Sequence, residues 1–364
     1  MTKGRTFLLA GLMSTVFLYA CGGGSDPTPN ILNPGNVNNG ELKGRVMLGN
    51  DGWILDLATG IYSRIPGMEQ WDDNPDYLGI ARVSAFPVAY TGSEVIETVE
   101  ECRNIQGLSS NEHCVKIHDQ NATLLKHINY RGNIITDAKL SRNREYVAIA
   151  RQYGAMTSDS YLEIHDRNGI IVSSNIVDDT YASLTFDWLP NSRLVYTFKQ
   201  SIYLTTSLST VGIPVITFTA DQGVPDDVAA SPDGTQLAFQ LRTSGSFAAD
   251  RGHIWVVNID GSGLRQLTDI PPSDNDPAVD NPAWSPDGQW ILAVEGRVHG
   301  QGSTAPGSRG VLYAIPSNGE RVLLTPDGST PAQPIFSYNG MIHGIRDPEL
   351  SYDFLSNGNH AWLP

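Results

Sequence analysis

The sequence predicts an all-β fold built from repeated small antiparallel sheets. Two segments, Ala229–Phe239 and Pro282–Val294, share a pattern in which a Ser-Pro-Asp-Gly turn is followed by an apolar strand. The turn serines, Ser231 and Ser285, are 54 residues apart. Strand-like runs with period-two alternation recur between Gly-, Pro-, Asn- and Asp-rich turns, and no long segment spaces its apolar residues as a helix does.

The turn residues predict how these strands are joined. In Ser-Pro-Asp-Gly, proline presets φ at about −65°, aspartate hydrogen-bonds the neighbouring backbone and glycine adopts positive φ. A second hairpin in each repeat contains Asp260-Gly261 or Asn318-Gly319, and Asn168-Gly169 has the same phase. Each repeat is therefore expected to form a small antiparallel sheet.

Weaker copies extend the repeat along the chain. They place equivalent turn residues at Ser141, Leu189 and Ser337, so that successive turns are 48, 42, 54 and 52 residues apart. Such spacings are typical of propeller blades, which must stack on their neighbours because one blade cannot bury its own apolar faces.

The repeat resembles the TolB-type propeller repeat, PxWSPDGxxIAF…IYxxDxDGxxxxxLT, most closely over 227–327 and recognisably over 134–218. The resemblance implies a six-bladed β-propeller of four-stranded antiparallel blades, with seven blades as the alternative. The first blade is expected to combine Arg45–Ile65 with Ile335–Ile345, so that strands from both chain ends close the ring. The other blades are expected around 78–128, 134–177, 184–218, 227–268 and 281–325.

The N-terminus resembles a bacterial lipoprotein signal. Lys3 and Arg5 precede an apolar run, Phe7–Ala20, which as a helix would span only ~21 Å and is too short for an anchor. The run ends in Leu-Tyr-Ala-Cys21. The resemblance implies removal of residues 1–20 and lipidation of Cys21, and Gly22 in place of Asp implies the outer membrane, facing the periplasm or the cell surface. The alternative is an ordinary secreted protein with an incidental cysteine.

The remaining chain divides into three parts. Residues 21–41 are rich in Gly, Asn and Pro and are expected to form a flexible tether, because they carry too few apolar side chains to fold. Residues 42–346 form the expected propeller. Residues 347–364 are an unassigned C-terminal tail, in which Phe354 and Trp362 suggest packing against the propeller.

Charge narrows the classes of partner. Without residues 1–20 the chain has 22 basic and 39 acidic residues, a net charge of −17. This excess of acid argues against nucleic acid and against adhesion to anionic lipid. It is compatible with cationic partners or divalent metal. We expect a monomer whose partner is an envelope protein or a glycan and whose only membrane contact is its lipid.

Two cysteines remain once Cys21 is set aside. Cys102 and Cys114 flank a segment rich in turn residues, and an exported protein folds in an oxidising compartment. The sequence therefore predicts a Cys102–Cys114 disulfide. A metal site with His113 is the alternative, although it has too few local ligands for a closed site.

Acidic residues cluster just before the expected opening strands of several blades, and these innermost strands line a propeller's channel. The candidates for a binding site at the channel mouth are Asp137, Asp226, Asp227, Asp276 and Asp280, with Asp72, Asp73, Asp76 and Asp274 nearby. Carboxylates gathered there would attract a cation or a basic segment, and their oxygens would suit calcium. The alternative is that these aspartates only bond turn and backbone amides.

Other residues favour structural roles. His118 and His165 lie in Ile-His-Asp at a repeat phase that suits a hydrogen bond to a turn, and Trp188 and Trp284 share a phase that suits packing between blades. The sequence has no Gly-x-Ser-x-Gly elbow, phosphate loop or dinucleotide fingerprint.

These features favour a non-catalytic, lipid-anchored module that binds a protein or glycan in the cell envelope, without a cofactor. The alternative is a glycan-active lyase or hydrolase that uses the channel-mouth carboxylates. A purely structural surface protein is the third hypothesis.

Overall fold

The computed structural model describes residues 42–48, 53–59, 62–64, 88–91, 94–99, 112–119, 123–131, 133–153, 159–178, 184–242, 252–270, 277–297, 309–325, 328–339 and 361–363. All regular elements within these ranges are β-strands. No helix in this part of the chain is long and apolar enough to cross a membrane.

The described strands form six four-stranded antiparallel sheets and one short parallel pair. We number the four-stranded sheets in chain order. The first sheet contains β26 (Ala361–Leu363), β1 (Arg45–Leu48), β2 (Trp53–Asp56) and β3 (Tyr62–Arg64), and the second contains β4 (Val88–Thr91), β5 (Glu94–Val99), β6 (Glu112–Asp119) and β7 (Leu124–Arg131). The third contains β8 (Asn133–Leu140), β9 (Tyr146–Tyr153), β10 (Asp159–Asp166) and β11 (Ile171–Asp178).

The second half of the chain repeats this plan. The fourth sheet contains β12 (Phe186–Trp188), β13 (Leu194–Phe198), β14 (Ser201–Thr205) and β15 (Gly212–Thr217), and the fifth contains β16 (Val224–Ala230), β17 (Gln236–Arg242), β18 (Gly252–Asn258) and β19 (Arg265–Gln266). The sixth contains β21 (Pro277–Trp284), β22 (Trp290–Arg297), β23 (Arg309–Pro316) and β25 (Gln333–Asn339), while β20 (Thr268–Asp269) pairs with β24 (Val322–Leu323).

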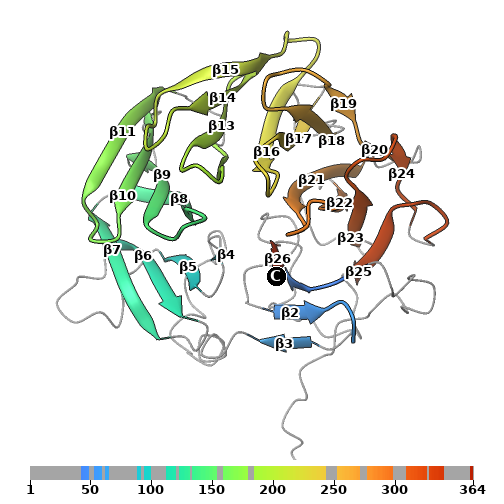
Figure 1. Cartoon of the computed structure of the whole chain (residues 1–364), viewed down its shortest axis with the longest axis horizontal. Helices are drawn as coiled ribbons and strands as arrows, with labels where there is room; N and C mark the ends of the chain where they lie inside the picture. Colours follow the sequence, from blue (N-terminus) through green and yellow to red (C-terminus); the bar gives the residue numbers. More distant parts are fainter. Residues whose placement is uncertain are drawn as a thin grey trace, which may run out of the picture.

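The sheets are arranged radially, as blades of a propeller (Figure 1). The innermost strands contact one another in the cyclic order β4, β8, β12, β16, β21 and β26, and β26 returns to β4. The predicted all-β propeller of small antiparallel sheets is thereby confirmed.

Both chain ends contribute to the first sheet, as predicted, but the C-terminal strand is a different one. Val46 of β1 lies opposite Trp362 of β26, and the Trp362 indole donates to the carbonyl of Lys43 at 2.8 Å. The expected contributor, Ile335–Ile345, was wrong: β25 covers its start and pairs with β23 in the sixth sheet, and Ser337 lies within a strand rather than a turn.

The pairing of β25 with the sixth sheet, instead of the first, has a physical cause beside the fifth sheet. Val322 and Leu323, which the repeat predicts as the last strand of the sixth sheet, pair instead with Thr268 and Asp269 beside the fifth sheet. The edge of β23 is then paired with β25. The tail, residues 347–364, supplies the missing inner strand of the first sheet, and its Trp362 packs in the core as expected.

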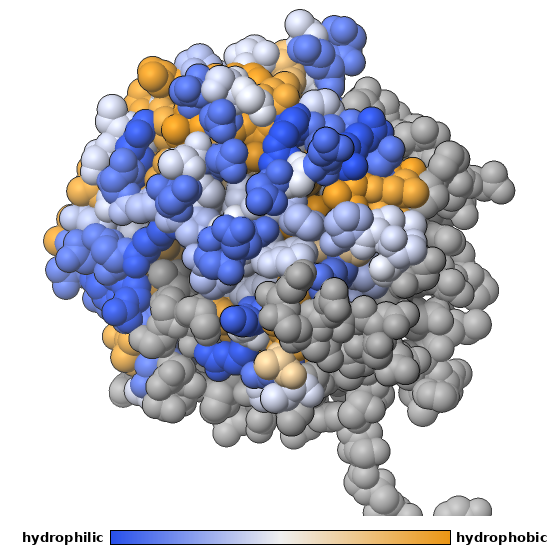
Figure 2. Space-filling view, turned by 45° about the vertical axis from the view of Figure 1, so that its right-hand side comes forward, coloured by the Kyte–Doolittle hydropathy of each residue, from blue (hydrophilic) through white to orange (hydrophobic). Residues whose placement is uncertain are grey.

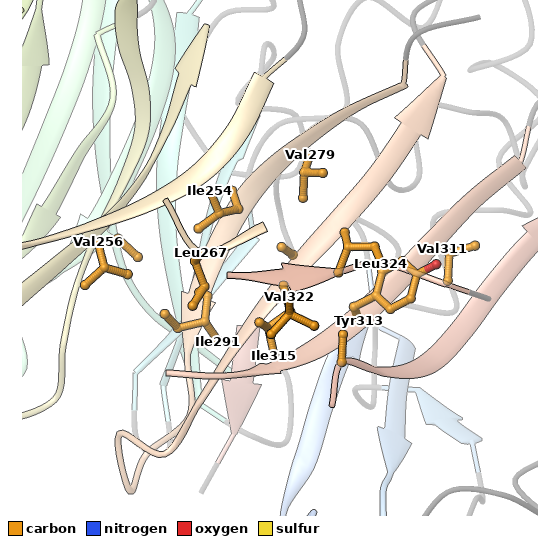
Figure 3. Packing of buried hydrophobic residues seen from close by; sticks show 13 residues of the cluster. Ile254, Val256, Leu267, Val279, Ile291, Val311, Tyr313, Ile315, Val322 and Leu324 are labelled. Carbon is orange, nitrogen blue, oxygen red and sulfur yellow. The ribbon is translucent and has the colours of Figure 1, made fainter. Parts of the chain in front are cut away.

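The hydrophobic core is divided among the interfaces between sheets. Five apolar clusters join the first sheet to the sixth, the sixth to the fifth, the fifth to the fourth, the fourth to the third and the third to the second. Figure 3 shows the cluster between the fifth and sixth sheets, where Ile254 and Val256 of β18 lie near Ile291 of β22, and Tyr313 of β23 lies beside Leu324. Each sheet thus buries its apolar face against its neighbour.

The repeated turns have the predicted chemistry. Ser231 Oγ donates to Asp233 Oδ1 at 2.6 Å and accepts from the backbone N–H of Gln236, and Gly234 has a φ of 73°. The Ser285 turn makes the same bonds. The indole of Trp188 donates to the carbonyl of Lys139, and that of Trp284 donates to the carbonyl of Ala229. Both tryptophans therefore link neighbouring sheets, as predicted.

Arg142 occupies the turn position that is proline in the fifth and sixth sheets. Its guanidinium donates to the carbonyls of Trp188, Ala230, Ser231 and Pro232 at 2.8–3.0 Å. One side chain from the third sheet thereby contacts the fourth and the fifth. The planar guanidinium, which holds several donors in a fixed geometry, suits this position better than the single ammonium of lysine.

We expect Arg142→Met to destabilise the fold, because it removes the donors to four carbonyls while retaining much of the aliphatic side chain. The free energy of unfolding should fall by about 2–4 kcal/mol, measured by denaturant titration. Lys43→Met is the matched control, since Lys43 is exposed and uses its carbonyl in the bond to Trp362. Equal stabilities of the two variants would contradict the role assigned to Arg142.

Candidate functional site

Three of the predicted acidic residues lie on neighbouring inner strands. Asp137 is on β8, Asp227 on β16 and Asp280 on β21. They lie partway along these strands rather than before them, because the strands begin earlier than the sequence pattern indicated. Each lies at or beside a register shift in the pairing of its strand, and such bulges commonly redirect a side chain.

Two of the bulges share an unusual backbone conformation. Asp227 has a φ of 50° and Asn281 has a φ of 56°, each four residues before its turn serine. Asp and Asn tolerate this left-handed region better than most side chains. The repeat therefore places a polar residue at the same bulge in two successive sheets.

Lys139 and Asp187 belong to the same cluster. The ammonium of Lys139 donates to the carbonyl of Phe186 at 2.7 Å and lies 3.7 Å from Asp137 Oδ2. Burial opposes its charge, but the carboxylates of Asp137, Asp187 and Asp227 outweigh burial and raise the pKa of Lys139. We call Asp137, Lys139, Asp187, Asp227 and Asp280 the axial cluster.

Lys139 and Asp187 were not among the predicted site residues, although the repeat contains a signal for both. The position two residues before the turn anchor holds Ala229 in the fifth sheet and Ala283 in the sixth. In the third and fourth sheets the same position holds Lys139 and Asp187. Opposite charges that replace alanine at one phase of adjacent repeats indicate a contact between the sheets.

The carboxylates of the axial cluster bond backbone amides across the sheet interfaces. Asp187 accepts from the N–H of Trp188 and, across the interface, from the N–H of Ala230, both at 2.8 Å. Asp227 Oδ2 accepts from the N–H of Asn281 in the sixth sheet at 3.4 Å. The cluster thus connects the third, fourth, fifth and sixth sheets.

Burial disfavours the charged form of several of these acids. It raises the pKa of Asp227 to about 6, against the bond from Asn281 and the charge of Lys139. Burial likewise raises the pKa of Asp137, and burial together with the charge of Asp227 raises that of Asp280 well above its usual range. Asp227 is therefore poised to exchange a proton at mildly acidic pH.

The other predicted acids lie elsewhere. Asp226 is buried, pairs with the Arg242 guanidinium and accepts from the N–H of Asp227. Asp276 falls outside the described residues, as do Asp72, Asp73, Asp76 and Asp274.

The described residues do not fit the calcium site that the sequence suggested. No group of three or more His, Cys, Asp or Glu side chains within them could hold a metal ion. In the axial cluster the ammonium of Lys139 already balances negative charge, and Asp187 uses both of its oxygens on backbone amides.

His165 makes the predicted bond to a turn. Its Nδ1 lies 3.2 Å from the carbonyl of Gly169, and its Nε2 lies 3.0 Å from Glu163 Oε2. Glu163 is buried and also accepts from Arg151 at 2.7 Å. Although burial opposes its charge, bonds from His165 and Arg151 lower the pKa of Glu163 to about 2. The network holds β9 and β10 together inside the third sheet.

The predicted cysteine chemistry is only partly within the described structure. Cys114 is fully buried on β6, opposite Val99 at the end of β5. Cys102 follows Val99 by three residues but lies outside the described residues, as does Cys21. The Cys102–Cys114 disulfide and the lipidation of Cys21 therefore stay predictions.

Comparison with known proteins finds similarity at the level of fold. No protein-family model and no curated protein matches the chain. Among solved structures, the "putative TolB from Agrobacterium tumefaciens" is 15% identical, with a TM-score of 0.43, and the match covers 71% of this chain and 90% of that one. Hydrazine synthase of Kuenenia stuttgartiensis is 16% identical, with a TM-score of 0.44 and coverage of 82% and 93%.

Prolyl oligopeptidase B of Galerina marginata is also similar, at 10% identity and a TM-score of 0.46, over 80% of this chain and 39% of the enzyme. The propeller itself is established by the sheet topology described above.

Asp227→Asn should change how stability depends on pH. The folded-state pKa of about 6 lies above the usual value of 3.8, so the contribution of Asp227 to stability is complete below pH 3.8 and is lost as pH rises through 6. An asparagine cannot ionise, and Asn281 shows that the equivalent bulge accepts one. The advantage of the variant should grow by about 2–3 kcal/mol between pH 4 and pH 8, measured by chemical unfolding.

Asp233→Asn serves as the control of opposite sign. Its turn bonds from Ser231 and Thr235 lower the pKa of Asp233, so its substitution should cost stability at pH 8 more than at pH 4. A difference between Asp227→Asn and the unmodified protein that does not vary with pH would contradict the burial assigned to Asp227.

Proposed function

We propose that the protein is a lipid-anchored β-propeller of the bacterial outer membrane that binds an envelope protein or a glycan without catalysis. The observation that carries the non-catalytic part is the bonding of the axial cluster. Asp187 and Asp227 accept from backbone amides of the next sheet, and Lys139 donates to the carbonyl of Phe186. Charged groups committed to holding sheets together are poorly suited to act on a substrate.

The proposed ring has six blades, one for each four-stranded sheet. The cyclic contacts of the inner strands support this count over the seven-bladed alternative. A closed ring leaves the turns and loops at its two ends as surfaces for a partner, which is how repeat scaffolds commonly present binding sites.

The proposed location depends on the N-terminal sequence. Phe7–Ala20 followed by Cys21 and Gly22 supports signal removal, lipidation of Cys21 and an outer-membrane destination. Several acyl chains on one cysteine anchor a protein firmly, because each buried methylene adds about 0.8 kcal/mol. The acidic chain then needs no electrostatic attraction to lipid.

One observation favours the glycan-active alternative. A carboxyl with a pKa of about 6, as in Asp227, could act as a general acid near neutral pH. Under that alternative, Asp227→Asn would abolish turnover on a panel of glycans while the protein stayed folded.

Mass spectrometry of the protein from bacterial envelopes tests the proposed anchor. We expect the mature N-terminal peptide to begin at Cys21 and to carry acyl chains, and Cys21→Ala to move the protein to the soluble fraction. Crosslinking in intact envelopes should then capture a discrete partner. An unmodified Cys21 would overturn the anchor, and turnover that depends on Asp227 would overturn the non-catalytic module.

A further inference from the structure

Exposed apolar side chains gather at one repeat phase. Of the ten large apolar side chains that are exposed among the described residues, nine lie within two positions of the start of a fourth strand or its counterpart β24. These nine are Leu124, Leu125, Ile170, Ile171, Val172, Val211, Ile213, Leu264 and Leu323. We call them the apolar rim.

The rim residues that belong to four-stranded sheets lie at one end of the propeller, because each is within two positions of the start of a fourth strand. In the third sheet, Ile171 pairs with His165, which pairs with Val147. Val147 in turn pairs with Leu140, directly before the turn between the first and second strands. The fourth sheet has the same arrangement, where Val195 pairs with Leu204 and Leu204 pairs with Ile213.

Bonds between sheets keep these ends together. The indoles of Trp188 and Trp284 donate to the carbonyls of Lys139 and Ala229, which precede the equivalent turns of the neighbouring sheets. We call this end of the propeller the turn face.

The apolar side chains of the rim expose a large fraction of their surface to solvent. Ile213, Val211 and Ile170 expose 72%, 64% and 63% of their surface. Figure 2 shows that hydrophobic surface reaches the margin of the molecule as separate patches between hydrophilic side chains. Exposed apolar side chains recur at this one phase in four consecutive sheets and in β24, and we take this recurrence as the mark of an interaction site.

The described chain also begins at the turn face. Leu42 to Gly44 lead into Arg45, which pairs with Asp56 beside the third-to-fourth strand turn of the first sheet. The N–H of Leu57 in that turn donates to the carbonyl of Gly44 at 3.0 Å. The lipid-bearing segment proposed above, residues 21–41, therefore joins the propeller at the same end as the apolar rim.

We propose that the apolar rim docks the turn face onto the surface of a zwitterionic phospholipid bilayer. This inference rests on the lipid anchor of the proposed function. A tether of about twenty flexible residues has a root-mean-square reach of only about 25 Å, so the face at which it joins stays close to the membrane.

The distribution of the rim favours a bilayer over a protein. Apolar side chains spread around four consecutive sheets can contact a flat, laterally extended surface together, whereas a compact partner would reach only part of them. The interfacial region of a bilayer also tolerates the polar turns between them. Hydrogen bonds in the turns lower the pKa values of Asp56, Asp166 and Asp260, so these exposed groups stay anionic. Anionic lipid would repel them, and the proposed surface is therefore zwitterionic lipid.

Fluorescence quenching tests the proposal on the mature lipidated protein, which begins at Cys21. Ile213→Trp places a reporter on the rim, and Gln200→Trp is the matched control, because Gln200 is exposed in the same sheet beyond Ser201. Leu204, opposite Ile213, lies four residues from Gln200, so the two sites are ~13 Å apart along the strand. In vesicles of brominated phosphatidylcholine, the fluorescence of the tryptophan introduced by Ile213→Trp should be quenched at least about twofold more than that of the tryptophan introduced by Gln200→Trp.

A second measurement removes the anchor. Residues 21–364 carrying Cys21→Ser, without the apolar run Phe7–Ala20, should retain weak binding to phosphatidylcholine vesicles in flotation. Ile170→Asp and Ile213→Asp should each lower the partition coefficient on the order of tenfold, because a charge replaces buried apolar surface. Thermal unfolding of both variants confirms that the fold is retained.

The outcomes separate the rim from the anchor. Preferential quenching of Ile213→Trp in a protein whose Cys21 proves unmodified would support the rim and overturn the anchor. A lipidated Cys21 with equal quenching at both sites would overturn the rim. Crosslinks between rims of two copies, without quenching, would also overturn it and assign the surface to self-association.

Discussion

The structure depends on the burial of apolar surface between neighbouring sheets. A four-stranded sheet with two apolar faces cannot shield both by itself, and each described cluster draws its side chains from two adjacent sheets. Radial stacking satisfies every sheet only if the series returns to its start. The pairing of β1 with β26 meets this condition, because it places strands from both chain ends in one sheet.

Polar and charged groups refine this arrangement rather than replace it. Arg142 on a turn, Asp187 on β12 and Asp227 at a bulge bond backbone groups of neighbouring sheets. Burial of several acids at the centre destabilises their ionised forms, an effect that Lys139 offsets only in part. The same side chains that resemble a binding site in sequence therefore act as connections between sheets.

Much of the fold was predictable because each repeat carries its own turn chemistry. Ser231 and Ser285 mark equivalent turns, and Trp188 and Trp284 mark equivalent contacts between sheets. The closing strand was not predictable in the same way. Ala361–Leu363 lacks a turn anchor, and β25 takes the sixth-sheet edge because Val322 and Leu323 pair with another strand. Partner choice among short strands depends on tertiary contacts that no local pattern records.

The candidate site was predictable in part. The pattern indicated Asp137, Asp227 and Asp280 but not their positions within bulges, because a register shift depends on pairing with the next strand. It gave no reason to expect that Asp226 would pair with Arg242. Lys139 and Asp187 became recognisable only when charges at one repeat phase were compared between adjacent sheets. A charge interaction between neighbouring sheets of this kind appears in the alignment of repeats, not within one of them.

Native-state hydrogen exchange on a chain truncated after Asn359, and so without β26, tests closure most directly. If the sheets support one another around a ring, removal of this strand should accelerate exchange in all described sheets, including β13 and β14 on the far side. Loss of protection confined to β1, β2 and β3, with unchanged protection elsewhere, would contradict a cooperative closed ring.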